Sequence, residues 1–159
     1  MINCNGNIKI REAGENDLKV LLEFEQEIIK GERLLDNSLK EGETHYYNFG
    51  DLLISPKAKV LVVEIEKEII GSGYATIKEA DSFLKHREFA YIGLMYVKPQ
   101  HRGQGINQQV LNRLKEWVIE MGITEIRLVV YDDNIHAKNA YKKAGFKAHV
   151  LEMRMEILT

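Results

Sequence analysis

The chain has 159 residues, with 22 Lys and Arg against 24 Asp and Glu and a formal net charge of −2. This length allows one domain with a single core, and 45% hydrophobic with 29% charged residues is typical of a folded globular protein. The near-neutral charge gives no general attraction to nucleic acid or an anionic membrane. No apolar run approaches the ~20 residues of a membrane span, and the single cysteine, Cys4, excludes an intrachain disulfide framework.

The first third of the chain predicts a strand, a helix and a mixed segment. Residues 8–13 alternate between apolar and polar, as a half-buried strand does. Helical spacing then begins near Asn16, with Asn16 or Asp17 as the N-cap, and ends at Gly31. Residues 34–57 predict a short helix followed by a loop, because leucines at helical spacing give way to glycines and a proline.

The middle of the chain predicts a hairpin. Residues 60–65 and 69–77 are apolar runs joined by the charged turn 66–68, although the usual Asn-Gly pair is absent. Gly71 and Gly73 lie two apart on the second strand and therefore share a face. Without side chains they allow another element to approach the backbone closely.

The second half alternates strands and helices. The pattern predicts a strand at 90–97, a strongly amphipathic helix at 105–121, a buried strand at 125–131, a short helix at 134–144 and a last alternating strand at 146–157. The order β-α-(α)-β-β-β-α-β-α-β combines a hairpin with strand–helix–strand units. We therefore expect one mixed α/β domain over residues 1–159, with a mixed twisted sheet flanked by helices.

The most informative stretch lies between the strand at 90–97 and the helix after it. Gly103 and Gly105 are two apart directly before that helix, whose first turn carries unpaired N–H donors and a partial positive charge. Such a turn suits a phosphate, although glycines here could equally make only a tight connection. The dinucleotide pattern Gly-x-Gly-x-x-Gly fails at Gln108, and no Gly-Lys-Ser/Thr occurs.

Two motifs together resemble the GNAT acetyltransferase superfamily. Gln100, His101, Arg102, Gly103, Gln104 and Gly105 match its Gln/Arg-x-x-Gly-x-Gly/Ala signature. A second pattern about thirty residues downstream matches the family's C-terminal motif through Asn134, Ala137, Tyr141, Gly145 and Phe146. The close resemblance covers about residues 89–157, while the first half fits in the order of its elements only.

This resemblance implies a GNAT-like fold with acetyl-CoA as co-substrate. The fourth strand would diverge from the fifth, so that pantetheine lies in the gap along Met95, Tyr96 and Val97, with an N–H near Val97 polarising the thioester oxygen. The backbone amides expected to bind the pyrophosphate are those of Arg102, Gly103, Gln104, Gly105, Ile106 and Asn107.

The resemblance also assigns roles to the downstream motif. Tyr141 would be the general acid that protonates the leaving thiolate; the alternative is core packing on the helix face of Ala137 and Ala144. Asn134 and Asn139 would contact the pantetheine amide or the phosphates. Their alternatives are an N-cap for Asn134 and an exposed helical position for Asn139.

The sequence does not identify the general base. Some family members carry a glutamate on the fourth strand, but the nearest match here is Tyr91, so that assignment does not carry over. Four other carboxylates remain, each more often a surface charge than a base: Glu27, Glu64, Glu79 and Glu88.

The acceptor pocket of this family is shaped by the first helices and their loop. Clustered aromatic and acidic residues in that region would suit an amine or cationic substrate; the alternative is that the tyrosines cap a small hydrophobic core. The residues are Phe24, Glu27, Glu43, His45, Tyr46, Tyr47 and Phe49.

The resemblance implies an N-acetyltransferase that moves an acetyl group from acetyl-CoA to a primary amine by direct attack, with a small-molecule acceptor favoured over a peptide. An acyl-CoA-binding sensor without turnover is the alternative from another class. Cys4 is a poor candidate for a covalent nucleophile, and His45, His101 and His136 are too scattered to predict a metal. We expect a cytoplasmic protein without nucleic-acid or membrane partners; a homodimer is compatible with the sequence but not required by it.

Overall fold

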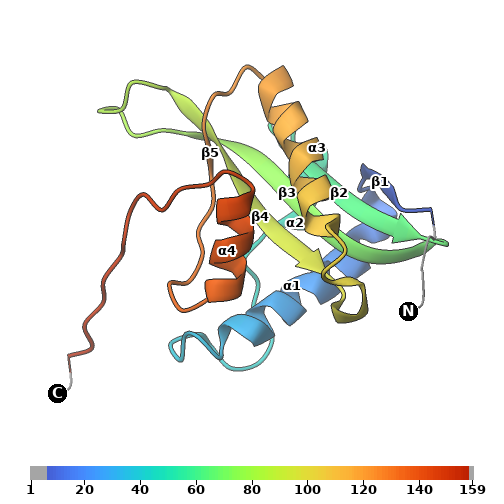
Figure 1. The fold of residues 1–159 in the computed structure, drawn as a ribbon, viewed down its shortest axis with the longest axis horizontal. Coiled ribbons are helices and arrows are strands. Elements are labelled where there is room, and N and C mark those ends of the chain that lie inside the picture. The colour runs from blue at the N-terminus through green and yellow to red at the C-terminus, as the bar shows by residue number, and fades with distance from the viewer. Residues whose placement is uncertain (1–6, 158–159) are drawn as a thin grey trace. The chain divides into compact units, whose positions relative to one another are not determined.

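The structure is a computed structural model that describes residues 7–157 (Figure 1), so the inference about Cys4 falls outside the described residues. The chain divides into two compact units, one ending at Val129 and the other beginning at Val130, and each is described by itself. Among the described residues, no helix is both long enough and apolar enough to cross a membrane.

The first unit is a mixed five-stranded sheet with helices packed on it, as predicted. Its strands lie in the order β1-β2-β3-β4-β5, antiparallel except for the parallel pair β4–β5. The elements in chain order are β1 (Lys9–Glu12), η1 (Glu15–Asp17), α1 (Leu18–Glu32), α2 (Phe49–Ile54), β2 (Ala58–Ile65), β3 (Glu68–Glu79), β4 (Glu88–Val97), η2 (Pro99–His101), α3 (Ile106–Glu120) and β5 (Ile126–Arg127).

The predicted hairpin is confirmed as β2 and β3. Its connection is the two-residue turn Glu66–Lys67, whose φ angles of 49° and 69° are both positive. Two positive φ angles match the twist of the flanking strands, which is why Asn-Gly usually occupies this turn. Here two charged residues adopt the same backbone conformation at some cost in strain.

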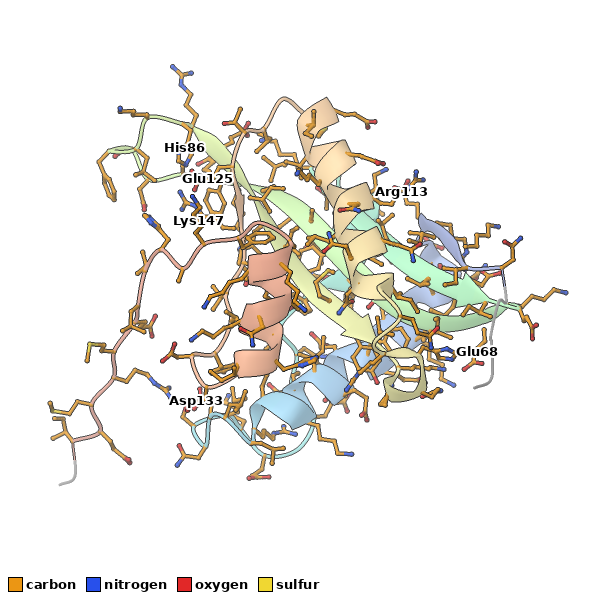
Figure 2. The ribbon with its side chains drawn as sticks, in the orientation of Figure 1. Glu68, His86, Arg113, Glu125, Asp133 and Lys147 are labelled. Atoms are coloured by element: carbon orange, nitrogen blue, oxygen red, sulfur yellow. The ribbon has the colours of Figure 1, made fainter. Side chains whose placement is uncertain are left out.

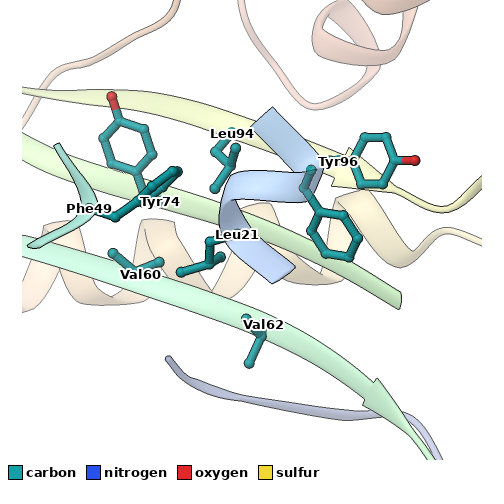
Figure 3. Packing of buried hydrophobic residues seen from close by; sticks show 8 residues of the cluster. Leu21, Phe49, Val60, Val62, Tyr74, Leu94 and Tyr96 are labelled. Carbon is teal, nitrogen blue, oxygen red and sulfur yellow. The ribbon is translucent and has the colours of Figure 1, made fainter. Parts of the chain in front are cut away.

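The two faces of the sheet pack against different helices. One face carries a buried cluster with α1 and α2 (Figure 3), made of Leu21, Phe24, Phe49, Val60, Val62, Tyr74, Leu94 and Tyr96. Successive residues of a strand point to opposite faces, so Gly73 faces away from this cluster, toward α3. A Cβ on Gly73 would lie 2.7 Å from Cγ1 of Val110 on α3. The predicted close approach is thus the packing of α3 on the sheet.

One local prediction in the first third of the chain was wrong, and another is confirmed in position only. The short helix lies at α2 and not at 34–39, where side-chain contacts instead shape an irregular loop: the Arg33 guanidinium donates to the Lys40 carbonyl at 2.6 Å. Asp17, one of the two predicted residues, is the N-cap of α1, but its side chain makes no cap hydrogen bond. Its carboxylate is engaged by Arg11 at 2.8 Å and by the Gly14 N–H at 2.8 Å.

The strand predicted at 125–131 is much shorter than the pattern suggests. β5 pairs with β4 through Ala90 and Tyr91 only, and Val129 is 81% exposed. Apolar composition marks residues able to join a sheet, but the neighbouring strand decides how many of them do so.

The second unit contains α4 (Ile135–Lys143), which confirms the predicted helix at 134–144. After α4, Gly145 has a φ of 101°, its N–H donates to the Lys142 carbonyl, and the Phe146 N–H donates to the Tyr141 carbonyl, both at 3.0 Å. These two bonds form the Schellman arrangement that ends a helix.

The last predicted strand, at 146–157, is absent from the structure of these residues. The alternation is present in the sequence, but Leu151, Met153 and Met155 are 66%, 85% and 84% exposed. A strand requires a hydrogen-bonded partner edge, and a favourable side-chain pattern does not supply one.

Candidate functional site

The turn that begins α3 has the properties of an anion site. Gly103 and Gly105 have φ angles of 76° and 75°, a conformation that residues with a Cβ rarely adopt. Gly105 is the N-cap of α3 and supplies no side-chain acceptor, and the first turn of the helix contains no acidic residue. The N–H groups of that turn and the positive end of the helix dipole are therefore available to a phosphate.

Arg102 ties this turn to the end of β4. Its N–H, expected among the phosphate donors, donates to the Pro99 carbonyl at 3.2 Å. Its Nε donates to the Val97 carbonyl at 2.8 Å, and its guanidinium lies 5.6 Å from the centre of the Tyr96 ring. The expected backbone N–H donors to phosphate therefore begin at Gly103. Arg102 instead fixes the connection between the end of β4 and the turn.

A salt bridge fixes the other side of the turn. Lys98 Nζ contacts the Glu68 carboxylate at 2.6 Å, which links the residue after β4 to the start of β3 (Glu68 is labelled in Figure 2). Both partners are partly or largely exposed, so the pair contributes orientation more than stability.

A β-bulge interrupts β4 just before this end. Ser72 of β3 pairs with Tyr96, but Tyr74 pairs with Gly93, so Leu94 and Met95 together oppose the single Gly73. Leu94 has a φ of 50°, which is rare for a residue other than glycine. Bulges of this kind redirect the strand and concentrate beside active sites. The sequence gives no signal for the bulge, since Leu94 continues the apolar pattern.

Beyond Tyr91, the outer edge of β4 carries no strand in the described part of the chain, because the ladder with β5 ends there. Met95 is the second residue of the bulge, and Tyr96 and Val97 lie between the bulge and the glycine turn; all three have one backbone edge without a partner strand among the described residues. An extended ligand can pair with such an edge as a strand does. This geometry fits the divergence of the fourth and fifth strands that the resemblance implies.

In the second unit, the expected site residues have structural contacts of their own. The Asn134 side-chain oxygen accepts from the Ala137 N–H at 3.2 Å, so Asn134 is the N-cap of α4. Asn139 is exposed on the same helix. Tyr141 is half-buried, and its ring meets Phe146 edge-on at 5.8 Å between centres.

The residues expected around the acceptor divide into core and surface. Phe24 and Phe49 are 3% and 2% exposed and belong to the buried cluster on α1 and α2. Glu27 and Glu43 are exposed. The two phenylalanines are therefore core residues, whereas the acidic residues lie at the surface.

Glu25 is a functional candidate that the sequence interpretation missed. Its side chain is completely buried, and it accepts from His45 Nδ1 at 2.7 Å, from the Tyr46 N–H at 2.7 Å and from the Tyr47 N–H at 2.9 Å. A charge is buried only when it is paired in this way. The available signal was that Glu25 occupies a position of the apolar stripe of its helix.

His45 makes the loop sensitive to pH. The hydrogen bond to Glu25 raises the pKa of His45 above its ordinary value of 6.5. Protonated His45 then stabilises the fold fully below that ordinary value, and the contribution is lost as pH rises through the raised pKa. We expect the free energy of unfolding of the native protein, relative to that of His45→Gln, to fall as pH rises from about 6.5 through the raised pKa of His45. Urea denaturation of both proteins at each pH checks this, and a constant difference contradicts it.

The carboxylates considered as general bases are mostly engaged elsewhere. Glu64 pairs with Arg11 at 3.0 Å, and Glu88 pairs with Lys57 at 2.7 Å. Glu79 is exposed at the end of β3. Glu27 is also exposed, but burial and then the Glu27 charge raise the pKa of Tyr96, which places this carboxylate near the end of β4.

Glu32, at the end of α1, is a second carboxylate that the sequence interpretation missed. It is half-buried, burial raises its pKa, and its carboxylate accepts from the Tyr46 hydroxyl at 2.8 Å. Its charge also raises the pKa values of Tyr47 and Tyr91, after the larger effect of their burial. Glu32 thus lies among the phenols that flank β4. Within residues 7–157, no three or more His, Cys, Asp or Glu side chains form a group that could hold a metal ion.

The comparisons with known proteins agree with this geometry. The chain is 30% identical over 152 residues to the thialysine N-epsilon-acetyltransferase of Bos taurus, covering 87% of this chain and 83% of that protein. A mutant protein from Bacillus halodurans superposes with a TM-score of 0.85 at 21% identity, covering 94% of this chain and 99% of that one. A predicted acetyltransferase with acetyl-CoA from Clostridium acetobutylicum superposes with a TM-score of 0.72 at 21% identity, covering 94% and 96%.

The family profile covers most of the chain, including the two parts of the candidate site in the first unit: the end of β4 and the glycine turn that begins α3. It is the profile of the acetyltransferase (GNAT) family, and it matches residues 25–146. The matched range includes the bulged β4, the glycine turn and α3, where the backbone geometry suits a strand-like, phosphate-bearing ligand. The chain therefore belongs to the acetyltransferase (GNAT) family, acyltransferases whose co-substrate is acetyl-CoA.

Proposed function

We propose that the protein transfers an acetyl group from acetyl-CoA to the primary amine of a small molecule, by direct attack in a ternary complex. The observation that carries this proposal is the junction of the open edge of β4 with the glycine turn of α3. The strand edge can pair with an extended chain and the glycine turn with phosphates, and five residues, 98–102, join them in sequence.

The two parts of this junction would bind different parts of acetyl-CoA. The amides of Gly103 to Asn107 would hold the pyrophosphate, and the backbone of Met95 to Val97 would pair with the pantetheine arm. An N–H near Val97 would donate to the thioester oxygen as negative charge develops there, a role commonly worth about 3–4 kcal/mol of barrier. Asn134 and Asn139 would add side-chain contacts to the amide or phosphate groups.

Acetyl transfer requires that the attacking amine lose a proton and that the leaving thiolate gain one. The amine nitrogen bonds to the thioester carbon, the carbon–sulfur bond breaks, and the thiolate takes a proton that Tyr141 would donate. An amine with a pKa of about 10 is only about 0.1% unprotonated at pH 7, so a carboxylate that accepts its proton lowers the barrier. No covalent enzyme intermediate is required.

A cationic acceptor suits the carboxylate beside the tyrosines. Glu32 provides negative charge that is partly withdrawn from water, and aromatic faces attract ammonium groups. The bovine relative takes its name from an ε-amine of a lysine analogue. We therefore propose a small, lysine-like amine as the acceptor class.

The test is binding and turnover measured side by side. Titration calorimetry with acetyl-CoA should give binding, and thiol release should appear with small ε-amines but not with peptides that present a free N-terminus or a free lysine side chain. Binding without turnover on any amine would favour the acyl-CoA sensor, and turnover on peptides alone would replace the small-molecule acceptor. Absence of binding would contradict the whole proposal.

A further inference from the structure

The peptide group that joins β4 to the turn after it is held at both of its polar atoms. Its N–H, that of Lys98, donates to the Ile70 carbonyl of β3 at 2.8 Å. Its carbonyl, that of Val97, accepts from Nε of Arg102, also at 2.8 Å. Both distances are those of well-formed hydrogen bonds. One partner in β3 and one in the turn therefore fix the plane of this peptide.

The register between β3 and β4 shows which edge the Val97 backbone faces. Val97 lies opposite Gly71, one step from the position where Lys98 donates to Ile70. In an antiparallel pair of strands, hydrogen-bonded and non-hydrogen-bonded positions alternate. Because Lys98 occupies a bonded position, Val97 occupies a non-bonded one, and its N–H and carbonyl both point to the outer edge of β4.

This alternation identifies the amide that the end of β4 offers to a ligand. The N–H groups of Tyr96 and Lys98, on either side of Val97, point toward β3. The outer edge carries no partner strand among the described residues beyond Tyr91. An oxygen of an extended ligand at this edge would therefore meet the Val97 N–H.

Arg102 occupies the other polar group at that edge. A bare Val97 carbonyl would place partial negative charge beside the Val97 N–H, where it would repel a thioester oxygen or a phosphate. The guanidinium offsets this charge through a charge-assisted hydrogen bond, which is stronger than a neutral one. Arg102 therefore both orients the peptide and makes the edge more favourable to an oxygen acceptor.

The guanidinium of Arg102 is itself located by the core, although the residue as a whole is exposed. It lies 5.6 Å from the centre of the Tyr96 ring. That ring lies 4.6 Å from Phe24, and both belong to the buried cluster, in which Figure 3 labels Tyr96. A cation beside an aromatic face is attracted to it, so the Arg102 side chain has a second contact that keeps Nε near Val97.

We propose that Arg102 is a positioning residue for acetyl transfer, which holds the Val97 carbonyl so that the Val97 N–H meets the thioester oxygen. This inference rests on the proposed function for its catalytic consequence. Arg102 directly precedes Gly103, so it links the turn that would hold the pyrophosphate to the amide that would act on the thioester. Because its Nε acts through the strand, loss of that donor should lower kcat more than acetyl-CoA affinity.

Three replacements of Arg102 separate its hydrogen bond from its charge. Arg102→Gln keeps an N–H donor at the position of Nε and loses the charge, whereas Arg102→Met has the same length and neither donor nor charge. Arg102→Lys keeps the charge and places a methylene where Nε lies. With a saturating amine, kcat should stay within about threefold of native in Arg102→Gln and fall about fivefold to tenfold in the other two, as for one lost hydrogen bond. The Kd for acetyl-CoA should agree within about twofold between Arg102→Gln and Arg102→Met, which carry the same charge.

Hydrogen exchange at single amides gives a readout independent of turnover. Loss of the Nε donor frees one end of the peptide, so the Lys98 amide should exchange faster in Arg102→Met than in Arg102→Gln, with no ligand present. In the native protein, acetyl-CoA should slow exchange at the Val97 amide more than CoA does, because CoA lacks the thioester oxygen.

Arg113→Met is the matched control for the loss of an arginine. Arg113, labelled in Figure 2, is exposed on α3 and lies 3.7 Å from Glu116 of the same helix. Its replacement should leave kcat and Lys98 exchange unchanged. A loss of kcat in Arg113→Met equal to that in Arg102→Met overturns the proposal, since removal of any arginine would then suffice.

The outcomes separate this role from the proposed function. A kcat in Arg102→Gln as low as in Arg102→Met, or below that in Arg102→Lys, overturns the proposal, because the charge or size of Arg102 would then matter and not its Nε donor. Equal Lys98 exchange in Arg102→Gln and Arg102→Met overturns the fixing of the peptide, and a difference in exchange without one in kcat overturns its role in catalysis. Native protein without turnover on any amine contradicts the proposed function, and Arg102 is then judged by exchange at Lys98 and Val97 alone.

Discussion

Tyr141→Phe is expected to lower turnover by about tenfold or more while the Kd for acetyl-CoA changes little. A tyrosine of pKa about 10 is a slightly weaker acid than a thiol of pKa about 8.5, so full proton transfer costs about 2 kcal/mol. A hydrogen bond to the charge that develops on sulfur still stabilises the transition state. Phenylalanine keeps the edge-on contact with Phe146 and removes only that donor. Steady-state kinetics with a saturating amine and calorimetry with acetyl-CoA measure the two quantities.

The pH profile separates catalysis from packing. Loss of a general acid removes the decline of kcat at high pH that the phenol would impose, whereas a packing defect scales the whole profile. Thermal unfolding should show a small change, because Tyr141 is only half-buried. Near-native turnover of Tyr141→Phe would contradict the role of general acid and leave Tyr141 a structural role, such as its edge-on contact with Phe146.

The sequence was sufficient to predict features that depend on local backbone conformation. Gly103 and Gly105 were recognised because positive φ angles favour glycine, and the structure has 76° and 75° there. The hairpin and the amphipathic helix of α3 follow from periodicity, which reports local geometry. The glycine turn and α3 form the proposed phosphate end of the site.

The sequence was insufficient wherever conformation depends on distant partners. Leu94 has a positive φ where the Ser72 hydroxyl donates to its carbonyl and its side chain packs in the core cluster, and neither Ser72 nor the cluster residues are its neighbours in sequence. Glu25 is charged yet buried because a loop twenty residues later supplies its donors. Residues 146–157 alternate as a strand does but form none, because pairing depends on an available edge.

Gly105→Ala is expected to weaken acetyl-CoA binding about tenfold to hundredfold, which corresponds to the loss of a charge-assisted hydrogen bond of about 1.5–3 kcal/mol. At a φ of 75°, alanine is strained by about 1–2 kcal/mol, and the turn can relieve this only by rotating its peptide groups. A rotation moves the amides at the start of α3 away from a shared anion. A Cβ at Gly105 would meet no atom within 4 Å, so the effect comes from backbone conformation and not from a clash.

Gly122→Ala is the control for this prediction, because the two glycines occupy opposite ends of the same helix. Gly122 has a φ of 73° and equally open space around its Cβ position. It ends α3 by donating to the Ile119 carbonyl at 2.9 Å, about 22 Å from the turn by helix length. Both variants should lose about 1–2 kcal/mol of unfolding free energy in urea, but only Gly105→Ala should lose affinity. Equal losses of affinity would show that stability alone controls binding, and an unchanged Kd in Gly105→Ala would remove the α3 turn from the phosphate site.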